Sequence, residues 1–313
     1  MELTQGIVIK STGKNYLIQS GKDVFSCTLR GKLRLANSRK TNPVAVGDHV
    51  QFYFQDDENT GVIEKVEKRR NHLLRKSTNL SKQSQVIAAN IDQAVLIATL
   101  DYPKTTRLFI DRFIVSAESF NIPVVLVFNK IDLYNESLKS ELDELKTVYN
   151  NIVTDTYLVS AVDKQYKPEI QPILKDKISV VAGHSGVGKS SFINLADPKL
   201  DIATNPLSKT HQTGKHTTTF AEMHSLDFGG YVIDTPGIKA FGISHIDKTE
   251  LYHFFPEMFA VARDCKFYNC LHIDEPGCAV KQAVIDGEIA ESRYYSYLNL
   301  FFDDRSKYRE ADY

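Results

Sequence analysis

Two short stretches decide the fold of this 313-residue chain: Gly183–Ser190, which reads GHSGVGKS, and Asn129–Asp132, which reads NKID. The first matches the phosphate-binding loop G-x-x-x-x-G-K-[ST], whose glycines let backbone N–H groups approach phosphate oxygens. The second matches N-K-x-D, a guanine-recognition motif. In an ordinary GTPase the guanine motif follows the phosphate loop, whereas here it precedes it. This order predicts a circularly permuted nucleotide-binding domain of the α/β class.

The residues on either side of the phosphate loop give it the context that the motif needs. The apolar run 178–182 predicts a buried strand, and 191–195 predicts the start of a helix whose positive N-terminus faces an anion. We expect Lys189 to reach the β- and γ-phosphates and the Ser190 hydroxyl to bind Mg²⁺. A glycine-rich turn that binds nothing is the alternative, and the strand–loop–helix context disfavours it.

A second motif of the phosphate site, D-T-P-G at 234–237, directly follows a strand-like run. A carboxylate at a strand end, such as Asp234, is expected to hold Mg²⁺ through water. The threonine-rich stretch 213–219 lies between the two phosphate motifs and predicts a switch segment, in which a hydroxyl completes the Mg²⁺ shell. We expect Thr218 to be this ligand, although Thr217 fits the sequence equally well.

The guanine motif predicts which nucleotide binds. Asp132 is expected to accept hydrogen bonds from N1–H and N2–H₂ of guanine, a pair of donors that adenine lacks, while Asn129 and Lys130 support the loop and cover the base. Ser160 and Ala161 resemble the second, weaker base-contacting loop, in which a backbone N–H meets the guanine oxygen. The sequence therefore predicts GTP and GDP as ligands, with Mg²⁺ as cofactor.

The expected nucleotide-binding residues come from several separate segments, which a permuted α/β sheet can still bring together. Joining the old termini of a domain and cutting it elsewhere is tolerated because termini tend to lie close together. The expected residues are Asn129, Lys130, Asp132, Ser160, Ala161, Gly183, Ser185, Gly186, Val187, Gly188, Lys189, Ser190, Ser191, Thr217, Thr218, Asp234 and Gly237.

Three of the four cysteines form a cluster with one histidine near the C-terminus: Cys265, Cys270, His272 and Cys278. Three thiolates and one imidazole make a closed tetrahedral Zn²⁺ set, with no open position for a catalytic water. A disulfide is disfavoured, because no signal peptide is visible and Cys27 is far away in sequence. We therefore expect a structural Zn²⁺ site.

The charge of the chain is divided unevenly, although its net value is only −1. Residues 1–82 hold 15 Lys and Arg against 8 Asp and Glu, a net charge of +7, and the remainder carries −8. Short alternating runs at 6–9, 15–18, 24–29, 49–54 and 61–66 predict a small five-stranded barrel of the OB type. Its basic loop, comprising Arg30, Lys32, Arg34, Arg39 and Lys40, suits an RNA backbone better than bases.

These observations predict three domains. An OB-fold RNA-binding barrel spans 1–70, a circularly permuted P-loop GTPase domain spans 71–240, and a mainly helical zinc-binding domain spans 241–313. The aromatic run 294–302 is expected to form an amphipathic helix with its rings mostly in the core. No apolar run is long enough to span a bilayer and no targeting segment is visible, so a cytoplasmic monomer is expected.

The motifs in this order resemble the ribosome small-subunit-dependent GTPase A family (RsgA, also called YjeQ) over nearly the whole length. The stretches 85–92 and 214–219 are also similar to that family. The resemblance implies binding to the small ribosomal subunit late in its maturation, GTP hydrolysis stimulated by the subunit, and contacts of the barrel and the zinc domain with ribosomal RNA. Rival interpretations are a GTP-regulated RNA- or protein-binding switch with little catalysis, and a metabolic phosphotransferase.

The residue that positions the attacking water is not evident from the motifs. Many GTPases place Gln directly after the D-x-x-G glycine, where this chain has Ile238, so slow intrinsic turnover is expected. We expect His216, beside the switch threonines, to take this catalytic role, although a surface histidine is an equally good interpretation. Residues 238–242 tie the switch to the zinc cluster, which predicts that loss of the γ-phosphate moves the zinc domain.

Overall fold

The computed structural model describes residues 3–31, 43–54, 60–76, 84–203, 221–234, 243 and 245–303. The described strands are β1 (Thr4–Ser11), β2 (Asn15–Ser20), β3 (Asp23–Leu29), β4 (His49–Phe54), β5 (Gly61–Val66), β6 (His72–Lys76), β7 (Ser84–Ala89), β8 (Gln93–Ala98), β9 (Val124–Phe128), β10 (Asp155–Leu158), β11 (Ile178–Ala182), β12 (Glu222–Ser225) and β13 (Tyr231–Asp234). The described α-helices are α2 (Arg107–Glu118), α3 (Glu136–Tyr149), α4 (Lys167–Leu174), α5 (Lys189–Ala196), α6 (Pro256–Ala262), α7 (Ala279–Ile285) and α8 (Glu291–Phe302). Short 3-10 helices are η1 (Ile131–Leu133), η2 (Lys164–Tyr166), η3 (Pro198–Leu200) and η4 (Lys248–Phe254).

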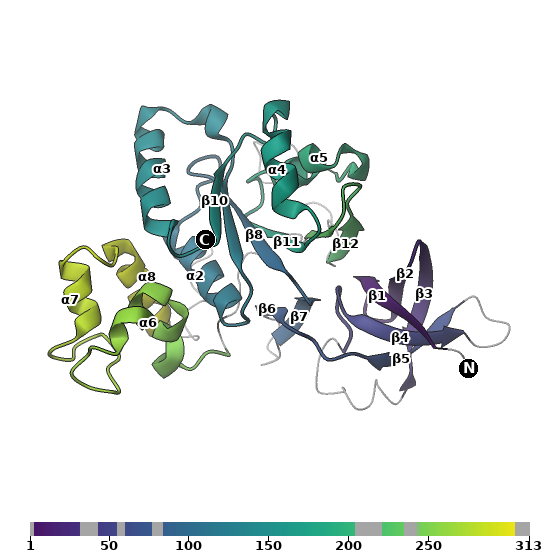
Figure 1. The fold of residues 1–313 in the computed structure, drawn as a ribbon, viewed down its shortest axis with the longest axis horizontal. Coiled ribbons are helices and arrows are strands. Elements are labelled where there is room, and N and C mark those ends of the chain that lie inside the picture. The colour runs from purple at the N-terminus through teal and green to yellow at the C-terminus, as the bar shows by residue number, and fades with distance from the viewer. Residues whose placement is uncertain are drawn as a thin grey trace, which may run out of the picture.

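Strands β1 to β5 form the expected N-terminal barrel, at the right of Figure 1. Strand β1 pairs with both β2 and β4, and β3 pairs with β5, so the five strands close on themselves. Tyr16, Ile18 and Phe52 lie in its buried core. Of the basic loop expected to bind RNA, only Arg30 is described and it pairs with Glu64; Lys32, Arg34, Arg39 and Lys40 lie outside the described residues.

The barrel is fixed to the next domain through the turn that precedes β4. Asp48 is fully buried and accepts two 2.7 Å hydrogen bonds from the guanidinium of Arg69. Gly47 has φ of +87°, and a Cβ atom there would lie 2.1 Å from the carbonyl oxygen of Ala89 on β7. Asn90 also donates to the carbonyl oxygen of Gly47 at 2.9 Å. The turn thus requires glycine and lies against the end of the β6–β7 hairpin.

The central sheet has the strand order β10-β9-β8-β11-β13-β12, and all of its pairs are parallel except β12–β13. Strand β11, which leads into the phosphate loop, lies between β8 and β13. The strands that precede the loop in the sequence therefore lie on one side of it and those that follow lie on the other. This arrangement is the expected circularly permuted GTPase fold.

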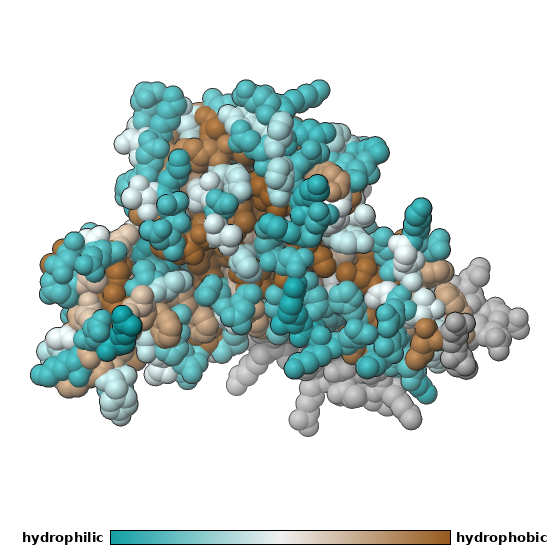
Figure 2. All heavy atoms as spheres, in the orientation of Figure 1, coloured by the Kyte–Doolittle hydropathy of each residue, from teal (hydrophilic) through white to brown (hydrophobic). Residues whose placement is uncertain are grey.

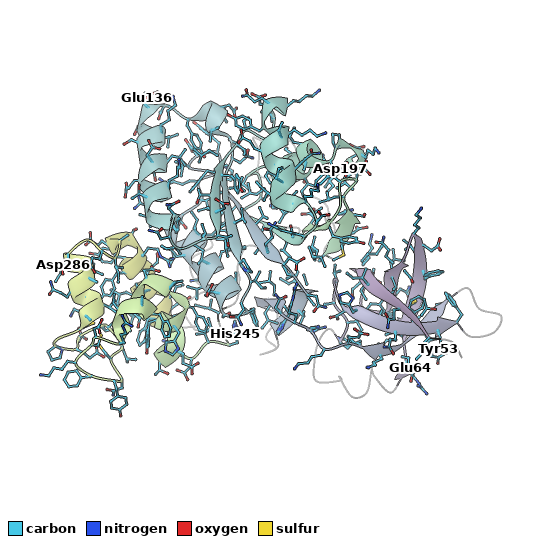
Figure 3. The ribbon with its side chains drawn as sticks, in the orientation of Figure 1. Tyr53, Glu64, Glu136, Asp197, His245 and Asp286 are labelled. Atoms are coloured by element: carbon cyan, nitrogen blue, oxygen red, sulfur yellow. The ribbon has the colours of Figure 1, made fainter. Side chains whose placement is uncertain are left out.

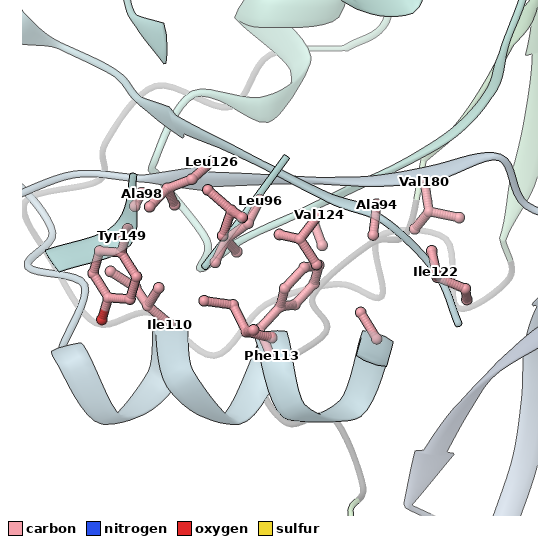
Figure 4. Packing of buried hydrophobic residues seen from close by; sticks show 14 of the residues in the cluster. Ala94, Leu96, Ala98, Ile110, Phe113, Ile122, Val124, Leu126, Tyr149 and Val180 are labelled. Atoms are coloured by element: carbon pink, nitrogen blue, oxygen red, sulfur yellow. The ribbon is translucent and has the colours of Figure 1, made fainter. Parts of the chain in front are cut away.

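Alternating side chains of the central strands build two cores, one on each face of the sheet. On β8, Leu96 points to the face covered by α2 and α3, while Val95 and Ile97 point to the face covered by α4 and α5. Figure 4 shows Ile110 and Phe113 of α2 packed beneath this first face. Figure 2 shows mostly hydrophilic residues on the visible surface, with hydrophobic ones visible between the helices.

The C-terminal domain packs α6, α7, α8 and η4 around a third core, at the left of Figure 1. Val115 of α2 belongs to this core, so α2 is shared between two domains. In the expected aromatic helix, α8, Tyr297 is fully buried, whereas Tyr295 and Phe302 are exposed. The prediction that the aromatic rings lie in the core is therefore right for one side of α8, whereas the outer side also carries aromatic rings.

A buried ion pair joins this domain to α2. Arg293 of α8 and Asp111 of α2 are both fully buried, and their Nη1 and Oδ1 atoms lie 2.7 Å apart. Tyr149 donates to the same carboxylate at 2.7 Å, and Glu257 binds Nε of Arg293 at 2.7 Å. Burial alone lowers the pKa of Arg293, but Asp111 and Glu257 outweigh it and raise that pKa above its usual range. The guanidinium therefore stays charged.

The expected domain boundaries after residues 70 and 240 stay predictions. Among the described residues, no helix combines the length and the apolar character needed to cross a bilayer.

Replacing Arg293 by Met should lower the free energy of unfolding by about 3–5 kcal/mol, because Asp111 would keep a buried charge with no cation beside it. Urea unfolding followed by far-UV circular dichroism measures this loss. The double variant D111N/R293M should be less destabilised than R293M, since neither charge of the pair remains. Equal losses in the two variants would show that the ion pair is not the cause.

Candidate functional site

The phosphate loop connects the end of β11 to the start of α5, as the motif predicts. Gly183, Gly186 and Gly188 all have positive φ, at 145°, 86° and 97°. A Cβ atom on Gly183 would lie 2.3 Å from the carbonyl oxygen of Ile97, and one on Gly188 would lie 2.3 Å from the Asn129 amide. The loop is therefore shaped by contacts that only glycine permits at these positions.

Lys189 begins α5 and folds back over the loop. Its Nζ donates to the carbonyl oxygens of Gly183 and His184, each at 2.9 Å. Burial lowers the pKa of Lys189, and the carboxylate of Asp234 opposes that shift. The ammonium thus lies within the loop, where a phosphate can compete with the two carbonyls for its hydrogen bonds. Ser190 and Ser191 follow it on the first turn of α5, and Ser185 is exposed in the loop.

Asn129 links the guanine motif to two other loops. Its Nδ2 donates to the carbonyl oxygen of Val187 at 2.7 Å, and its Oδ1 accepts from the backbone N–H of Ala161 at 2.9 Å. The side chain is 1 % exposed. One amide thereby joins the guanine motif, the phosphate loop and the Ser160–Ala161 loop, which are expected to bind the same nucleotide.

Lys130 and Asp132 lie at the outer side of this junction. Lys130 Nζ donates to the carbonyl oxygens of Gly186 at 2.6 Å and Tyr102 at 2.5 Å. Burial lowers the pKa of Lys130, against the opposing effect of Asp132. Asp132 is exposed on η1, so its carboxylate is open to a ligand. Ser160, in contrast, is buried, and its hydroxyl has no hydrogen-bond partner among the described residues.

Asp234 ends β13 and pairs in register with Val181 of β11, directly before the phosphate loop. The structure therefore brings Asp234, Lys189 and the guanine motif to the same edge of the sheet. His216, Thr217 and Thr218 fall in the stretch 204–220, and Gly237 and Ile238 fall in 235–242; all five lie outside the described residues. Their expected roles stay predictions.

The Cys₃His cluster also comes together, with all four ligand atoms within 4.8 Å of one another. His272 Nδ1 lies 3.6 Å from Cys265 Sγ and 3.4 Å from Cys278 Sγ, and the two sulfurs are 4.0 Å apart. A tetrahedral Zn²⁺ with usual bond lengths requires about 3.5 Å between N and S and about 3.8 Å between two sulfurs. The four residues therefore fit zinc.

Hydrogen bonds around the cluster suit thiolate ligands. The N–H of Ala279 donates to Cys265 Sγ at 3.3 Å, and that of Lys281 donates to Cys278 Sγ at 3.4 Å. Both donors belong to the N-terminal turn of α7. Burial raises the pKa of the Cys270 thiol to about 12, so a bound cation is needed to keep that sulfur deprotonated at neutral pH.

Sequence reasoning missed several residues that hold these loops. Tyr134 donates from its hydroxyl to the carbonyl oxygen of Asn129 at 2.8 Å and accepts from the N–H of Leu100 at 2.9 Å. Tyr294 and Tyr297 of α8 donate to the carbonyl oxygens of His272 and Leu271, at 2.7 and 2.6 Å. No local motif marks these tyrosines, since their partners are distant in sequence or are plain backbone carbonyls.

Two family models match the chain: RsgA N-terminal domain over residues 5–63 and RsgA GTPase over residues 66–244. The small ribosomal subunit biogenesis GTPase RsgA 2 of Bacteroides thetaiotaomicron is 48 % identical over 309 residues, 98 % of this chain and 99 % of that protein. The RsgA protein of Christiangramia forsetii is 45 % identical over 312 residues and 99 % of both chains.

Solved structures agree with these matches. YjeQ from Thermotoga maritima superposes with a TM-score of 0.76 at 37 % identity, covering 96 % of this chain and 98 % of that one. YloQ, described as a circularly permuted GTPase, gives a TM-score of 0.72 at 30 % identity, covering 96 % of this chain and 94 % of that one. Since the family models, the full-length relatives and these structures agree, this chain belongs to the RsgA family of circularly permuted GTPases.

Proposed function

We propose that this protein hydrolyses GTP during late maturation of the small ribosomal subunit in the cytoplasm, binding the subunit through ribosomal RNA as a monomer and being stimulated by it. The observation that carries the proposal is the Asn129 amide, which joins the guanine motif to the phosphate loop at 2.7 Å. The names of the relatives from Bacteroides thetaiotaomicron and Christiangramia forsetii supply the ribosomal partner.

The phosphate loop would bind the triphosphate chiefly by electrostatics. Lys189 would exchange its bonds to the carbonyls of Gly183 and His184 for bonds to the β- and γ-phosphate oxygens. The backbone N–H groups of the loop would surround the triphosphate. Mg²⁺ would be held by Ser190 and Thr218, with Asp234 acting through water, and it would neutralise charge on the phosphates. His216 would position the attacking water, because Ile238 cannot.

Specificity for guanine would rest on Asp132, whose exposed carboxylate can accept two N–H groups of the base. Lys130, fixed by the carbonyls of Gly186 and Tyr102, would cover the base. Since the N–H of Ala161 is bound to Asn129, another backbone N–H of the Ser160–Ala161 loop would meet the guanine oxygen. The barrel would supply the RNA contacts. Lys14, Lys22, Lys65 and Lys68 are exposed on it, in agreement with the net charge of +7 over residues 1–82.

Replacing Asp132 by Ala should weaken GDP binding at least about 100-fold, because two hydrogen bonds to a charged group are lost, each worth about 1.5–3 kcal/mol. Binding of ADP should not change, so the preference for guanine should disappear. Titration calorimetry with both nucleotides measures this. Glu136→Gln, which removes an exposed carboxylate four residues away, is the matched control; the proposal fails if D132A still prefers GDP.

The purified protein should contain one Zn²⁺ per chain, and Cys270→Ser should release it, because the closed set loses one of its four ligands. Metal content by mass spectrometry gives the stoichiometry, and proteolysis tests whether the domain around α7 loosens. Cys27→Ala removes the buried barrel cysteine outside the cluster and should keep the metal. Full zinc retention in C270S would exclude this ligand set.

Purified small ribosomal subunits should raise GTP turnover by at least about tenfold, since the bound subunit would bring the water-positioning group into line with the γ-phosphate. His216→Ala should abolish that stimulation and leave GTP binding intact, whereas His211→Ala, five residues earlier in the same stretch, should not. Phosphate release with and without subunits measures both effects. Absence of any stimulation in the unmodified protein would contradict the ribosomal role, and full stimulation of H216A would remove His216 from the mechanism.

A further inference from the structure

Helix α2 is enclosed on two sides by different domains. Ile110 and Phe113 pack into the core beneath the central sheet, while Val115 belongs to the core of the C-terminal domain. Figure 1 shows α2 between β8 and the helices α6 and α8, and Figure 4 shows its packing on the sheet. All twelve residues of α2 are described, and Glu118 alone is exposed. The helix cannot shift without disturbing both cores.

The first turn of α2 contacts the phosphate loop. The ring of Phe109 lies against the ring of His184, with centroids 3.8 Å apart and planes tilted by 33°. His184 is the second residue of the loop, and its carbonyl oxygen accepts a hydrogen bond from Lys189. Burial lowers the pKa of His184, and the neighbouring Lys189 lowers it further, so the ring is neutral at pH 7. The contact is therefore a tilted ring–ring contact between a phenyl group and an uncharged imidazole.

Two residues further along, α2 is held from the C-terminal domain. Asp111 accepts from Arg293 at 2.7 Å, and the guanidinium in turn makes bonds of 2.7 and 3.2 Å to Glu257. The same group lies 4.6 Å above the ring of Phe255. The planar guanidinium of Arg293 therefore constrains the directions of its hydrogen bonds to Asp111 and Glu257, in addition to attracting their charges. His245, at the junction of the two domains in Figure 3, adds a 2.9 Å contact to Ser119 at the far end of α2.

We propose that Arg293 and Asp111 are positioning residues for the nucleotide site: the C-terminal domain holds α2, and α2 holds His184 of the phosphate loop through Phe109. The inference rests on the proposed function, since it requires a nucleotide at that loop. When Lys189 turns to a phosphate, the carbonyl of His184 loses the hydrogen bond from Lys189 and keeps only the longer one, 3.4 Å, from the N–H of Val187 among the described contacts. The ring of His184 is still held by the Phe109 ring.

Coupling between two sites is reciprocal, so a nucleotide at the loop must also steady the C-terminal domain. GDP binding should slow hydrogen exchange of the backbone amides of α8 by about fivefold, the lower end of usual coupling. Helix α8 touches neither the phosphate loop nor the guanine motif in any described contact. A structural role confined to holding the domains together would leave its exchange independent of the nucleotide.

The test is hydrogen exchange of the full-length protein with and without saturating GDP, read by mass spectrometry over residues 291–302. Phe109→Leu keeps an apolar side chain, although a smaller one, but removes the ring contact, and should abolish the GDP-dependent protection of α8. Phe109→Tyr keeps an aromatic ring and should retain the GDP-dependent protection of α8. Glu118→Gln, at the exposed end of the same helix, should retain it as well. Release of a fluorescent GDP analogue should be about fivefold faster from Asp111→Asn than from the unmodified protein.

Two results would overturn the inference: exchange of α8 that is the same with and without GDP, or GDP-dependent protection that persists in F109L. Calorimetry separates this failure from that of the proposed function. If the unmodified protein binds GDP but α8 does not respond, only the positioning role is wrong. If the unmodified protein binds no guanine nucleotide, the proposed function fails and the positioning role fails with it.

Discussion

The side chain of Asn129 is the contact on which the site depends. Its amide donates one hydrogen bond to the phosphate loop and accepts one from the Ser160–Ala161 loop, and Asn129 is itself the first residue of the guanine motif. These loops follow β9, β10 and β11, which are successive in sequence but not in the order usual for such proteins. Because the strands are parallel, their carboxyl ends meet at one edge, and a single buried amide can span all three loops. The permutation therefore changes the chain order and leaves the site intact.

The permutation does alter what is attached to the site. After β13 the chain leaves the sheet and enters the C-terminal domain, which returns to pack on α2 through Arg293 and Asp111. The nucleotide site thus has two links to this domain, one along the chain and one through packing. The covalent link runs through residues outside the described part, whereas the packing link is formed by described side chains: the buried Arg293 and Asp111, and the half-buried Phe109 and His184. Together they place the C-terminal domain against the helix that supports the phosphate loop.

Much of this could be predicted because its signals are local. The phosphate loop, the guanine motif and the Cys₃His cluster are short patterns whose chemistry dictates their geometry, and the five barrel strands follow from alternation. Arg293 could not be predicted, since a charged residue on an amphipathic helix normally indicates a solvated face. Its burial follows from partners 182 and 36 residues away, Asp111 and Glu257. The Phe109–His184 contact was missed for the same reason: it depends on how two elements pack.

The choice of an ion pair at the domain junction has a physical consequence. An apolar pair of similar volume holds two packed elements about as strongly, because desolvation offsets most of the attraction between buried charges. What the guanidinium adds is direction: two bonds to Glu257 of α6 fix its plane within the C-terminal domain, and a third bond crosses to Asp111 of α2. A rotation of α8 against α2 that apolar packing would tolerate misaligns this third bond, because Glu257 keeps the guanidinium from turning with Asp111. The junction is therefore built to fix an orientation, which is the property that a domain needs if it is to hold a loop in place from a distance.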